Sequence, residues 1–477
     1  MIGYIIGAIL IAFVLIILIR TLNFKPKRVD RPTPEPVSIS ADTVADSLAQ
    51  MVRCRTVSHP DPALDDEVEF EKFIRLLPTL FPLVHATCSP SRVGNRALLY
   101  KWQGKTDGDP TVLMAHYDVV DADAEKWEKP PFDGIIENGI LWGRGVIDTK
   151  SSLNAVLTAA ELLIKDGFTP ERDIWFAFAG DEEVSGHGAR DIVALFKEHG
   201  ITPSLVLDEG GVVIDGVFPG VTRSCAVIGV AEKGMLNAEY SVSGNGGHSS
   251  APVPNTPIAR LSAACQRVEK HPFKYRITPP AKKMFDTVAP HSTFLYRMIF
   301  ANLWCFGPVL NMITKRSGGQ LNALLRTTVA FTQASGSDAI NVIPTTATLS
   351  SNSRILPGES MQSTLEYLKR TVNDDSVTVR AIGGHEPSRL SDTDCEGWHR
   401  LADAVSDTWP DAIVSPYLMT ACADARHWSA ISDRVYRFSP LHPTHEQSST
   451  VHGNNERLGV DMLAESVEFY VRLMKKS

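Results

Sequence analysis

Short apolar segments that end at a histidine or an acidic residue recur along this chain of 477 residues. The segments at 111–115, 173–179 and 204–207 have the length and composition of buried parallel strands. Between the first two, residues 151–167 place apolar side chains on one helical face and end at a glycine. This alternation predicts an α/β fold with a doubly wound, mostly parallel sheet. Because the carboxyl ends of such strands share one edge of the sheet, we expect a functional site there.

Five residues of the metal-ligand type follow apolar segments and are expected to converge at that edge. They are His116, Asp148, Glu183, Asp208 and His452. Two imidazoles and three carboxylates, with no cysteine among them, suit two borderline divalent ions such as zinc. Asp148 follows the sequence GRGVI, where a carboxylate can bridge two neighbouring cations. The pattern therefore predicts a two-metal hydrolase.

Several of these residues have a simpler interpretation when each is taken alone. His116 and Asp118 form a pair in which the acid can orient the imidazole, but they also fit a satisfied polar pair at a strand end. Asp148 could simply cap the helix that follows it. Glu182 and Glu183 belong to an acidic run that could be a solvated turn. In a site, one of them would bind metal while its neighbour carries a proton.

The N-terminus is strongly apolar. The first 19 residues carry no charged side chain and, as a helix, would cross the roughly 30 Å hydrocarbon core of a membrane. We predict a single-pass transmembrane anchor at 1–19. The alternative is a cleaved signal peptide, although the segment lacks a basic start and a typical cleavage site. Residues 20–38 hold four prolines among basic residues and predict a semi-rigid linker. Those basic residues favour a cytoplasmic body, but signal anchors often break this rule, so the side of the membrane stays open.

The remainder is predicted to form a catalytic domain with an insertion. Residues 39–233 are its first part, 234–355 an inserted α+β lid or dimerisation domain, and 356–477 its second part. Half-exposed alternating strands at both ends mark the insertion. The net charge of −8 offers no basic patch, so we predict no nucleic-acid partner. Seven scattered cysteines predict reduced thiols rather than a disulfide framework.

Seven motifs occur in one order along the chain: HYDVV, GRGVIDTKSS, GDEEVSGHGA, LDEGG, GHSS, NVIP and HGNNE. They resemble the co-catalytic di-zinc amidohydrolase family of aminoacylase, carboxypeptidase S and glutamate carboxypeptidase. The resemblance covers about residue 40 to 477 and is greatest to the branch of carboxypeptidase S and the N-fatty-acyl-amino-acid synthase/hydrolases. It implies that His116 and Asp208 hold one zinc ion and that Asp148 bridges both ions. Glu183 and His452 would hold the second ion.

The resemblance also implies roles for residues outside the ligand set. Asp118 would orient the histidine two positions before it, and Glu182 would act as general base and acid. His248 would stabilise the oxyanion, commonly from the partner subunit, although alone it fits a turn. Asn341 and Arg354 would grip the carboxylate of the substrate. Two departures, DTKSS after the bridging aspartate and the loop Ala-Cys-Ala-Asp at 421–424, affect a helix start and the edge of the substrate pocket.

These features together lead us to expect a hydrolase of amide bonds next to a free carboxylate, in N-acyl amino acids or peptides. Two Zn²⁺ ions per subunit are expected, with Co²⁺ or Mn²⁺ as possible substitutes. The alternative within the enzyme class is a carboxypeptidase or dipeptidase. A catalytically silent scaffold is disfavoured because all ligands and Glu182 are present, and a transport component because there is one hydrophobic span. The family resemblance implies a homodimer formed through the inserted domain.

Overall fold

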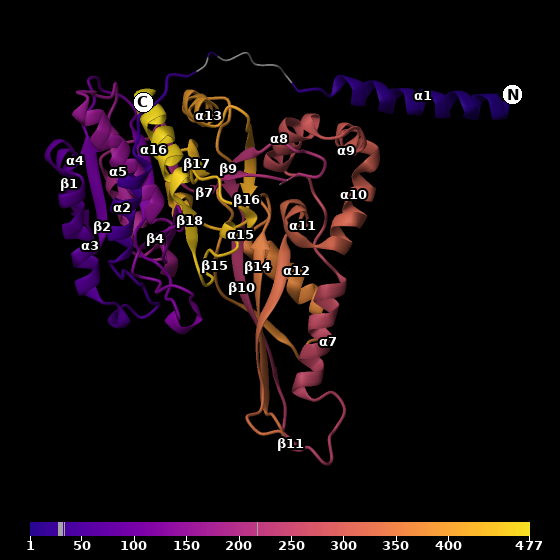
Figure 1. Ribbon diagram of the computed structural model, residues 1–477. Helices are drawn as coiled ribbons and strands as arrows, with labels where there is room; N and C mark the ends of the chain where they lie inside the picture. The colour runs from indigo at the N-terminus through magenta and orange to yellow at the C-terminus, as the bar shows by residue number, and fades with distance from the viewer. Residues whose placement is uncertain (27–31, 33, 217) are drawn as a thin grey trace.

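A large nine-stranded sheet forms the centre of the computed structural model, which describes residues 1–477 except 27–31, 33 and 217 (Figure 1). The strands follow the order β1-β2-β6-β3-β7-β17-β9-β16, with β8 beside β9. Their bounds are β1 Ser89–Val93, β2 Ala97–Trp102, β3 Thr111–His116, β6 Ile174–Ala179, β7 Leu205–Gly211, β8 Val213–Ile214, β9 Cys225–Glu232, β16 Ile413–Met419 and β17 Val435–Phe438. The three strands predicted from apolar segments are therefore confirmed as β3, β6 and β7, which lie next to one another.

The sheet is mixed rather than mostly parallel. The strands β6, β3, β7 and β17 run parallel to one another, as predicted for the doubly wound core. On one side β2 and β1 are antiparallel, and on the other β9 is antiparallel to β17. The apolar segments predicted buried strands but not their direction, because a buried antiparallel strand has the same composition.

Helices cover both faces of this sheet and enclose the main core. On one face α5 packs against α2 and α16, and α16 packs against α13. On the other face α6 and α14 bury Ile192, Phe196 and Trp428 against the strands. The bounds are α2 Ala41–Val52, α3 Glu67–Leu80, α4 Pro82–Thr87, α5 Lys150–Lys165, α6 Gly188–Glu198, α13 Glu396–Thr408, α14 Ala425–Trp428, α15 His445–Ser448 and α16 Val460–Lys475. The helix predicted at 151–167 is confirmed as α5.

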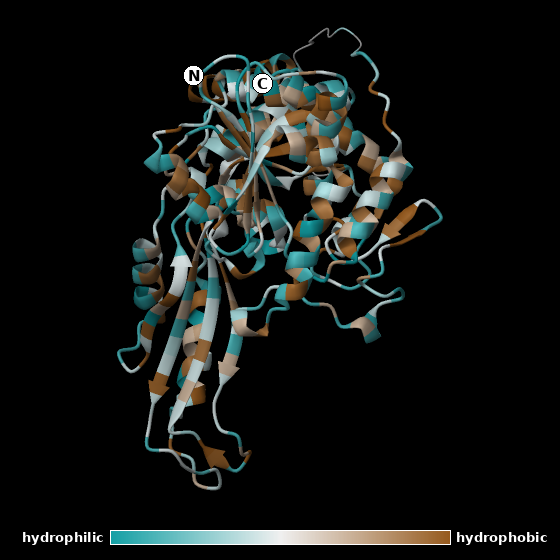
Figure 2. Ribbon diagram, turned by 90° about the vertical axis from the view of Figure 1, so that its left-hand side faces the viewer, coloured by the Kyte–Doolittle hydropathy of each residue, from teal (hydrophilic) through white to brown (hydrophobic). Residues whose placement is uncertain are grey.

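A second, four-stranded antiparallel sheet in the order β12-β14-β10-β15 extends away from the body (Figure 2). We refer to it as the lid, after the predicted inserted lid or dimerisation domain. Its elements are β10 Gly234–Ser243, α7 Pro257–Lys270, β12 Thr328–Ser335, β14 Thr346–Ile355, α12 Met361–Val372 and β15 Thr378–His385. The short pair β11 Gly247–His248 and β13 Val342–Ile343 forms its tip. Because β15 pairs with β10, the boundary predicted at residue 355 is wrong and lies near His385. The sequence of β15 does not indicate which of the two sheets this strand joins.

The helical segment between α7 and β12 packs on the large sheet, not on the lid. It comprises α8 Pro279–Val288, α9 Phe294–Ala301, α10 Leu303–Ser317 and α11 Gly319–Leu325. Met284 and Phe285 of α8 are buried with Cys225 of β9 and Leu418 of β16. The prediction that 234–355 forms one inserted domain is therefore wrong for this helical segment, because the segment shares its core with the edge strands of the catalytic sheet.

The N-terminal helix α1, Ile2–Asn23, projects from the body beside α8 and α9 (Figure 1). By length and composition it could cross a membrane, a test that a signal sequence also passes. The helix continues four residues past the predicted end at 19. The predicted linker at 20–38 lies partly outside the described residues, namely at 27–31 and 33. A small sheet of β4 Ile135–Glu137, β5 Ile140–Trp142 and β18 Arg457–Gly459 completes the body.

Candidate metal centre and active site

Asp148 lies between two imidazoles at the carboxyl edge of the large sheet. Its Oδ1 is 3.1 Å from Nε2 of His116, at the end of β3, and its Oδ2 is 3.0 Å from Nε2 of His452. The two histidines are 336 positions apart in the sequence (452 − 116). Each carboxylate oxygen therefore faces a different imidazole, which is the arrangement that a bridging ligand requires.

The acidic turn after β6 supplies the neighbouring carboxylates. Glu183 Oε2 is 3.1 Å from Nε2 of His452, and its buried Oε1 has no hydrogen-bond partner among the residues that the structure describes. Asp118 holds this turn, because its two oxygens accept the backbone N–H groups of Glu182 and Glu183, both at 3.1 Å. Nδ1 of His116 lies 3.0 Å from the backbone oxygen of Asp118 and 3.4 Å from its carboxylate. The turn is thus a built site and not a solvated acidic loop.

Glu209 lies beside the metal-type cluster, next to Asp208 in the chain. Oε1 of Glu209 is 3.5 Å from Nε2 of His116. Asp208 instead accepts two backbone N–H groups, from Glu209 at 2.9 Å and from Ala425 at 2.7 Å. Ligand-type atoms of His116, Glu182 and Glu209 lie within 4.8 Å of one another, as do those of His116, Asp148 and Glu183. The assignment of Asp208 as a metal ligand stays a prediction, and Glu209 is a second candidate ligand from the same strand end.

The electrostatics of the cluster fit bound cations. Burial raises the pKa of Glu182 well above its usual range, and burial together with the charge of Asp148 raises the pKa of Glu209 to about 8. Hydrogen bonds to Asp148 and Glu183 raise the pKa of His452 to about 10. Buried acids that repel one another in this way are stabilised by positive charge. Oε1 of Glu183, which has no hydrogen-bond partner among the described residues, offers a further ligand atom to an ion. The residues therefore fit a pair of divalent cations.

Glu456 is a functional residue that the sequence did not reveal. It is fully buried, and one carboxylate oxygen binds Arg144 at 2.8 Å. The same carboxylate accepts the backbone N–H groups of Gly145, Ile147 and Asp148 at 2.7–3.2 Å. Glu456, which follows His452 by four positions in the sequence, therefore fixes the loop that presents Asp148. The motif HGNNE contains the residue, but its partners three hundred positions away were not predictable from spacing.

A polar group from the lid approaches the same edge of the sheet. Arg354 of β14 donates from Nη1 to Sγ of Cys422 at 3.2 Å, and His385 of β15 lies 3.2 Å from that sulfur. Cys422 belongs to the loop after β16, whose Ala423 and Asp424 are buried. Arg354 has no carboxylate among its described hydrogen-bond partners, which are Asn352 and Cys422. Its guanidinium is therefore available to an anionic ligand.

His248 and Asn341 lie far from this edge within one chain. The backbone of His248 pairs with that of Val342 at the exposed tip of the lid (Figure 1). The backbone oxygen of Asn341 accepts the N–H of Ser249 at 3.1 Å. Arg354 lies at the opposite end of β14, whose ten residues span roughly 30 Å at 3.3 Å per residue. The predicted pairing of Asn341 with Arg354 around one carboxylate is therefore not formed within the chain.

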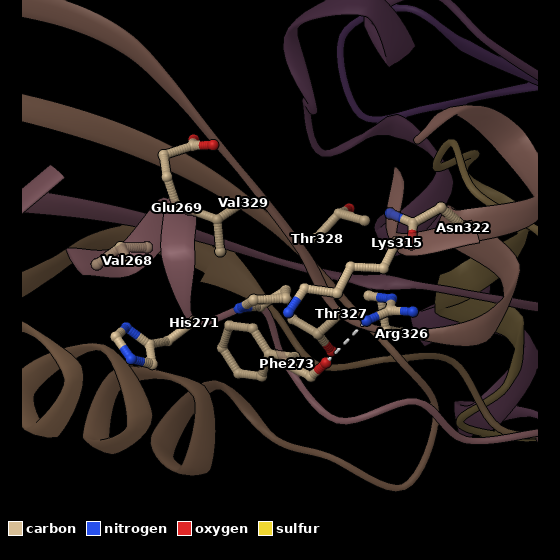
Figure 3. Close-up of a pocket in the computed structure, with 11 residues that line it drawn as sticks. Val268, Glu269, His271, Phe273, Lys315, Asn322, Arg326, Thr327, Thr328 and Val329 are labelled. Atoms are coloured by element: carbon tan, nitrogen blue, oxygen red, sulfur yellow. Dashed lines mark hydrogen bonds between the residues drawn. The ribbon is translucent and has the colours of Figure 1, made fainter. Parts of the chain in front are cut away.

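A separate cavity of about 210 Å³ lies between α7, α10, α11 and the start of β12 (Figure 3). Arg326 is its most buried charged group and donates to the oxygens of Phe273 and Asn311. Lys315 reaches toward it from α10. The cavity contains none of the metal-type residues, so it is not the catalytic site.

Residues 112–476 match the peptidase family M20/M25/M40. The chain belongs to this family. The probable carboxypeptidase S-like 2 of Dictyostelium discoideum is 33 % identical, covering 100 % of this chain and 94 % of its own. The N-fatty-acyl-amino acid synthase/hydrolase of Mus musculus is 35 % identical, covering 91 % of this chain and 88 % of its own.

A solved M20 structure shows the same fold. The M20 family metallo-carboxypeptidase of Sulfolobus solfataricus aligns with a TM-score of 0.66 and 15 % identity, covering 91 % of this chain and 98 % of its own. The predicted family and branch are confirmed by these relatives. This M20/M25/M40 peptidase is therefore a hydrolase of amide bonds.

Proposed function

We propose that this M20/M25/M40 peptidase hydrolyses N-acyl amino acids at the amide bond next to the free carboxylate. The observation that carries the proposal is the contact of Arg354 with Cys422, in the loop whose Ala425 donates to Asp208 at the end of β7. An arginine without an acidic partner, close to a hydrolytic cluster, suits a substrate with a carboxylate beside its scissile bond. The relatives named above as N-fatty-acyl-amino acid synthase/hydrolase and carboxypeptidase S-like support this substrate class.

Two divalent cations are assigned to the cluster, with Asp148 as the shared ligand. His116 and Glu209 are proposed to hold one ion, and Glu183 and His452 the other. Zinc suits this set of imidazoles and carboxylates, and Co²⁺ or Mn²⁺ can replace it. When bound, such ions polarise the substrate carbonyl and make water more acidic.

Glu182 is proposed to carry the proton. Its carboxylate lies in the same group of ligand-type atoms as His116 and Glu209, and burial raises its pKa, which favours proton uptake. One carboxylate oxygen accepts the proton of the attacking water and then donates it to the leaving amide nitrogen. Asp118 keeps the backbone of Glu182 fixed during both transfers. Arg354 orients the substrate through its carboxylate.

His248 and Asn341 are proposed to complete the site of a partner subunit. Both lie at the exposed tip of the lid, where the chain's own cluster is out of reach. His248 would donate to the developing oxyanion and Asn341 would bind the substrate carboxylate beside Arg354. This assignment requires a homodimer formed through the lid.

The second candidate is a carboxypeptidase or dipeptidase, which the carboxypeptidase S-like relative favours. A substrate panel separates the two functions. Purified, zinc-loaded protein is assayed in parallel on N-acyl amino acids of increasing acyl length and on dipeptides with matched C-terminal residues. The proposal expects kcat/KM to be at least about tenfold higher for the acyl series, since one or two well-bound methylenes give this discrimination. Higher values for the dipeptides would establish the second candidate instead.

The helix α1 is proposed to be a retained anchor that holds the enzyme at a membrane. It is 22 residues long and has almost no buried surface in its apolar part. Long-chain acyl substrates concentrate in such membranes, which agrees with the proposed substrate class.

A further inference from the structure

The helices α9 and α10 expose an unusual amount of apolar surface beside the C-terminal end of α1. The exposed apolar side chains of α9 and α10 have 38–60 % of their surface accessible, and they are Phe294, Leu295, Tyr296, Trp304, Val309, Met312 and Ile313. A patch of this kind on a folded body marks an interaction site rather than ordinary surface.

The same segment is basic, although the whole chain carries a net charge of −8. Residues 294–317 contain no aspartate or glutamate, and they contain Arg297, Lys315 and Arg316. Lys282 of the preceding helix α8 lines a cavity together with Phe300 and Trp304, and it pairs with Asp286. Apolar side chains combined with flanking cations are typical of helices that lie in the interface of an anionic membrane.

The anchor helix α1 docks on this surface through several contacts. Asn302, between α9 and α10, donates to the oxygen of Ile17 at 3.3 Å and to Thr21 at 3.2 Å. Arg20 donates to the oxygen of Ala301 at 3.2 Å. Farther along α1, the rings of Phe13 and Trp304 meet edge to face at 5.5 Å.

The length of α1 then fixes how deep these helices lie. At 1.5 Å per residue its 22 residues measure about 33 Å, which only just matches a hydrocarbon core of about 30 Å. Residues 2–16 alone measure about 22 Å and could not cross it. The docked residues 17–21 must therefore also lie within the core or at its border. Trp304, which contacts Phe13, then lies about 15 Å along α1 from its C-terminal end.

We propose that α9 and α10 form a second membrane-binding element, which inserts its apolar side chains into the same leaflet that α1 enters. The occupant of this surface is a phospholipid bilayer with anionic headgroups near Lys315 and Arg316. A cavity of about 520 Å³ between the end of α1 and α8–α10 is lined by Arg20, Trp304 and the ion pair of Lys282 with Asp286 among others, and it offers space for a lipid headgroup. The inference rests on the proposed anchoring role of α1, but not on the proposed substrate.

The test uses the full chain in vesicles of phosphatidylcholine with phosphatidylglycerol that carry a diazirine on one acyl chain. After irradiation, labelled peptides are identified by mass spectrometry. We expect labelling of 294–313 to be within about threefold of that of α1 and at least about tenfold above that of the lid strands. A variant with Leu295→Glu, Met312→Glu and Ile313→Glu should lose about tenfold of the label in 294–313 while α1 keeps its label.

A matched control replaces three exposed apolar residues of the lid, with Val253→Glu, Ile340→Glu and Ile382→Glu, and should leave both signals unchanged. Labelling confined to residues 2–23 would overturn the proposal, as would protection of 294–313 by a second copy in cross-linked dimers. If α1 is absent from the mature protein, label on 294–313 still supports the second membrane-binding element. A lack of label on 294–313 rejects that element. Activity of the vesicle-bound enzyme on N-acyl amino acids is scored separately, so failure of either proposal is recognised independently.

Discussion

The guanidinium of Arg354 and the thiol of Cys422 are 3.2 Å apart, which joins the lid strand β14 to the loop after β16 at the edge of the catalytic sheet. The other neighbour of this sulfur, His385, belongs to the last lid strand. The contact therefore brings lid and catalytic sheet together at the point where a substrate carboxylate is expected.

Replacing Arg354 by alanine should lower kcat/KM for N-acyl amino acids by about 10- to 100-fold, because a charge-assisted hydrogen bond to the carboxylate is lost. The corresponding N-acyl amino acid amides, which lack that charge, should lose much less. Arg380→Ala is the matched control, since Arg380 is an exposed lid arginine paired with Glu239. Equal losses for acids and amides would contradict the assigned role.

The variant Glu182→Gln should reduce kcat by about 10²- to 10⁴-fold, because the glutamine cannot carry the proton. Metal content, measured by elemental analysis of the purified variant, should stay at the wild-type level. Full activity in Glu182→Gln would show that another group is the base.

Glu209 and Asp208 should respond differently to removal of their charge. Glu209→Gln is expected to lose about one of the two bound ions, since a ligand carboxylate is lost. Asp208→Asn should keep both ions but unfold at a lower temperature, because Asp208 accepts the N–H groups of Glu209 and Ala425. Elemental analysis and thermal unfolding of both variants decide between the two ligand assignments, and the reverse pattern would restore Asp208.

Lys233 should make stability depend on pH in a defined direction. Burial, with the nearby charge of Arg354, lowers the pKa of Lys233 to about 7, while its Nζ donates to the oxygens of Ala323 and Arg326. Between pH 7 and about 10.4 the unfolded chain then binds more protons than the folded one, so the free energy of unfolding rises with pH. The contribution has a slope of up to about 1.4 kcal/mol per pH unit.

Urea unfolding at pH 7 and pH 9 measures this slope, and Lys233→Met removes the titrating group. The variant should show a smaller rise in the free energy of unfolding between the two pH values. An unchanged pH dependence would mean that Lys233 is not the group responsible.

Mixing two inactive variants tests whether His248 acts in the partner's site. His248→Ala and Glu182→Gln subunits should each be nearly inactive as homodimers. Coexpression should restore about a quarter of the wild-type activity, because half of the dimers are mixed and one of their two sites is intact. If the coexpressed pair stays as inactive as either homodimer, His248 does not serve the partner's site.

Much of the centre was predictable because burial and chemistry leave their mark on local sequence. The apolar segments before His116 and Glu183 gave the strands β3 and β6, and the acids at their ends could only be tolerated together near positive charge. His116, Asp148, Glu183 and His452 do meet in the structure.

The parts that were missed depend on long-range pairing. Asp208 and Glu209 are neighbours of equal charge, and the sequence does not indicate that Glu209 also lies beside His116, since this depends on the register and twist at the end of β7. The strand β15 joins the lid by pairing with β10, more than a hundred positions earlier, and α8 finds its core on β9 and β16. Local patterns do not record such partners.

The carboxylate of Glu456 fixes the loop of Asp148 from a position close to α16, the last helix. Loss of this one carboxylate would free the backbone of Gly145, Ile147 and Asp148 together. Both proposed cation sites share Asp148, so a residue that is not itself a ligand would control the occupancy of both.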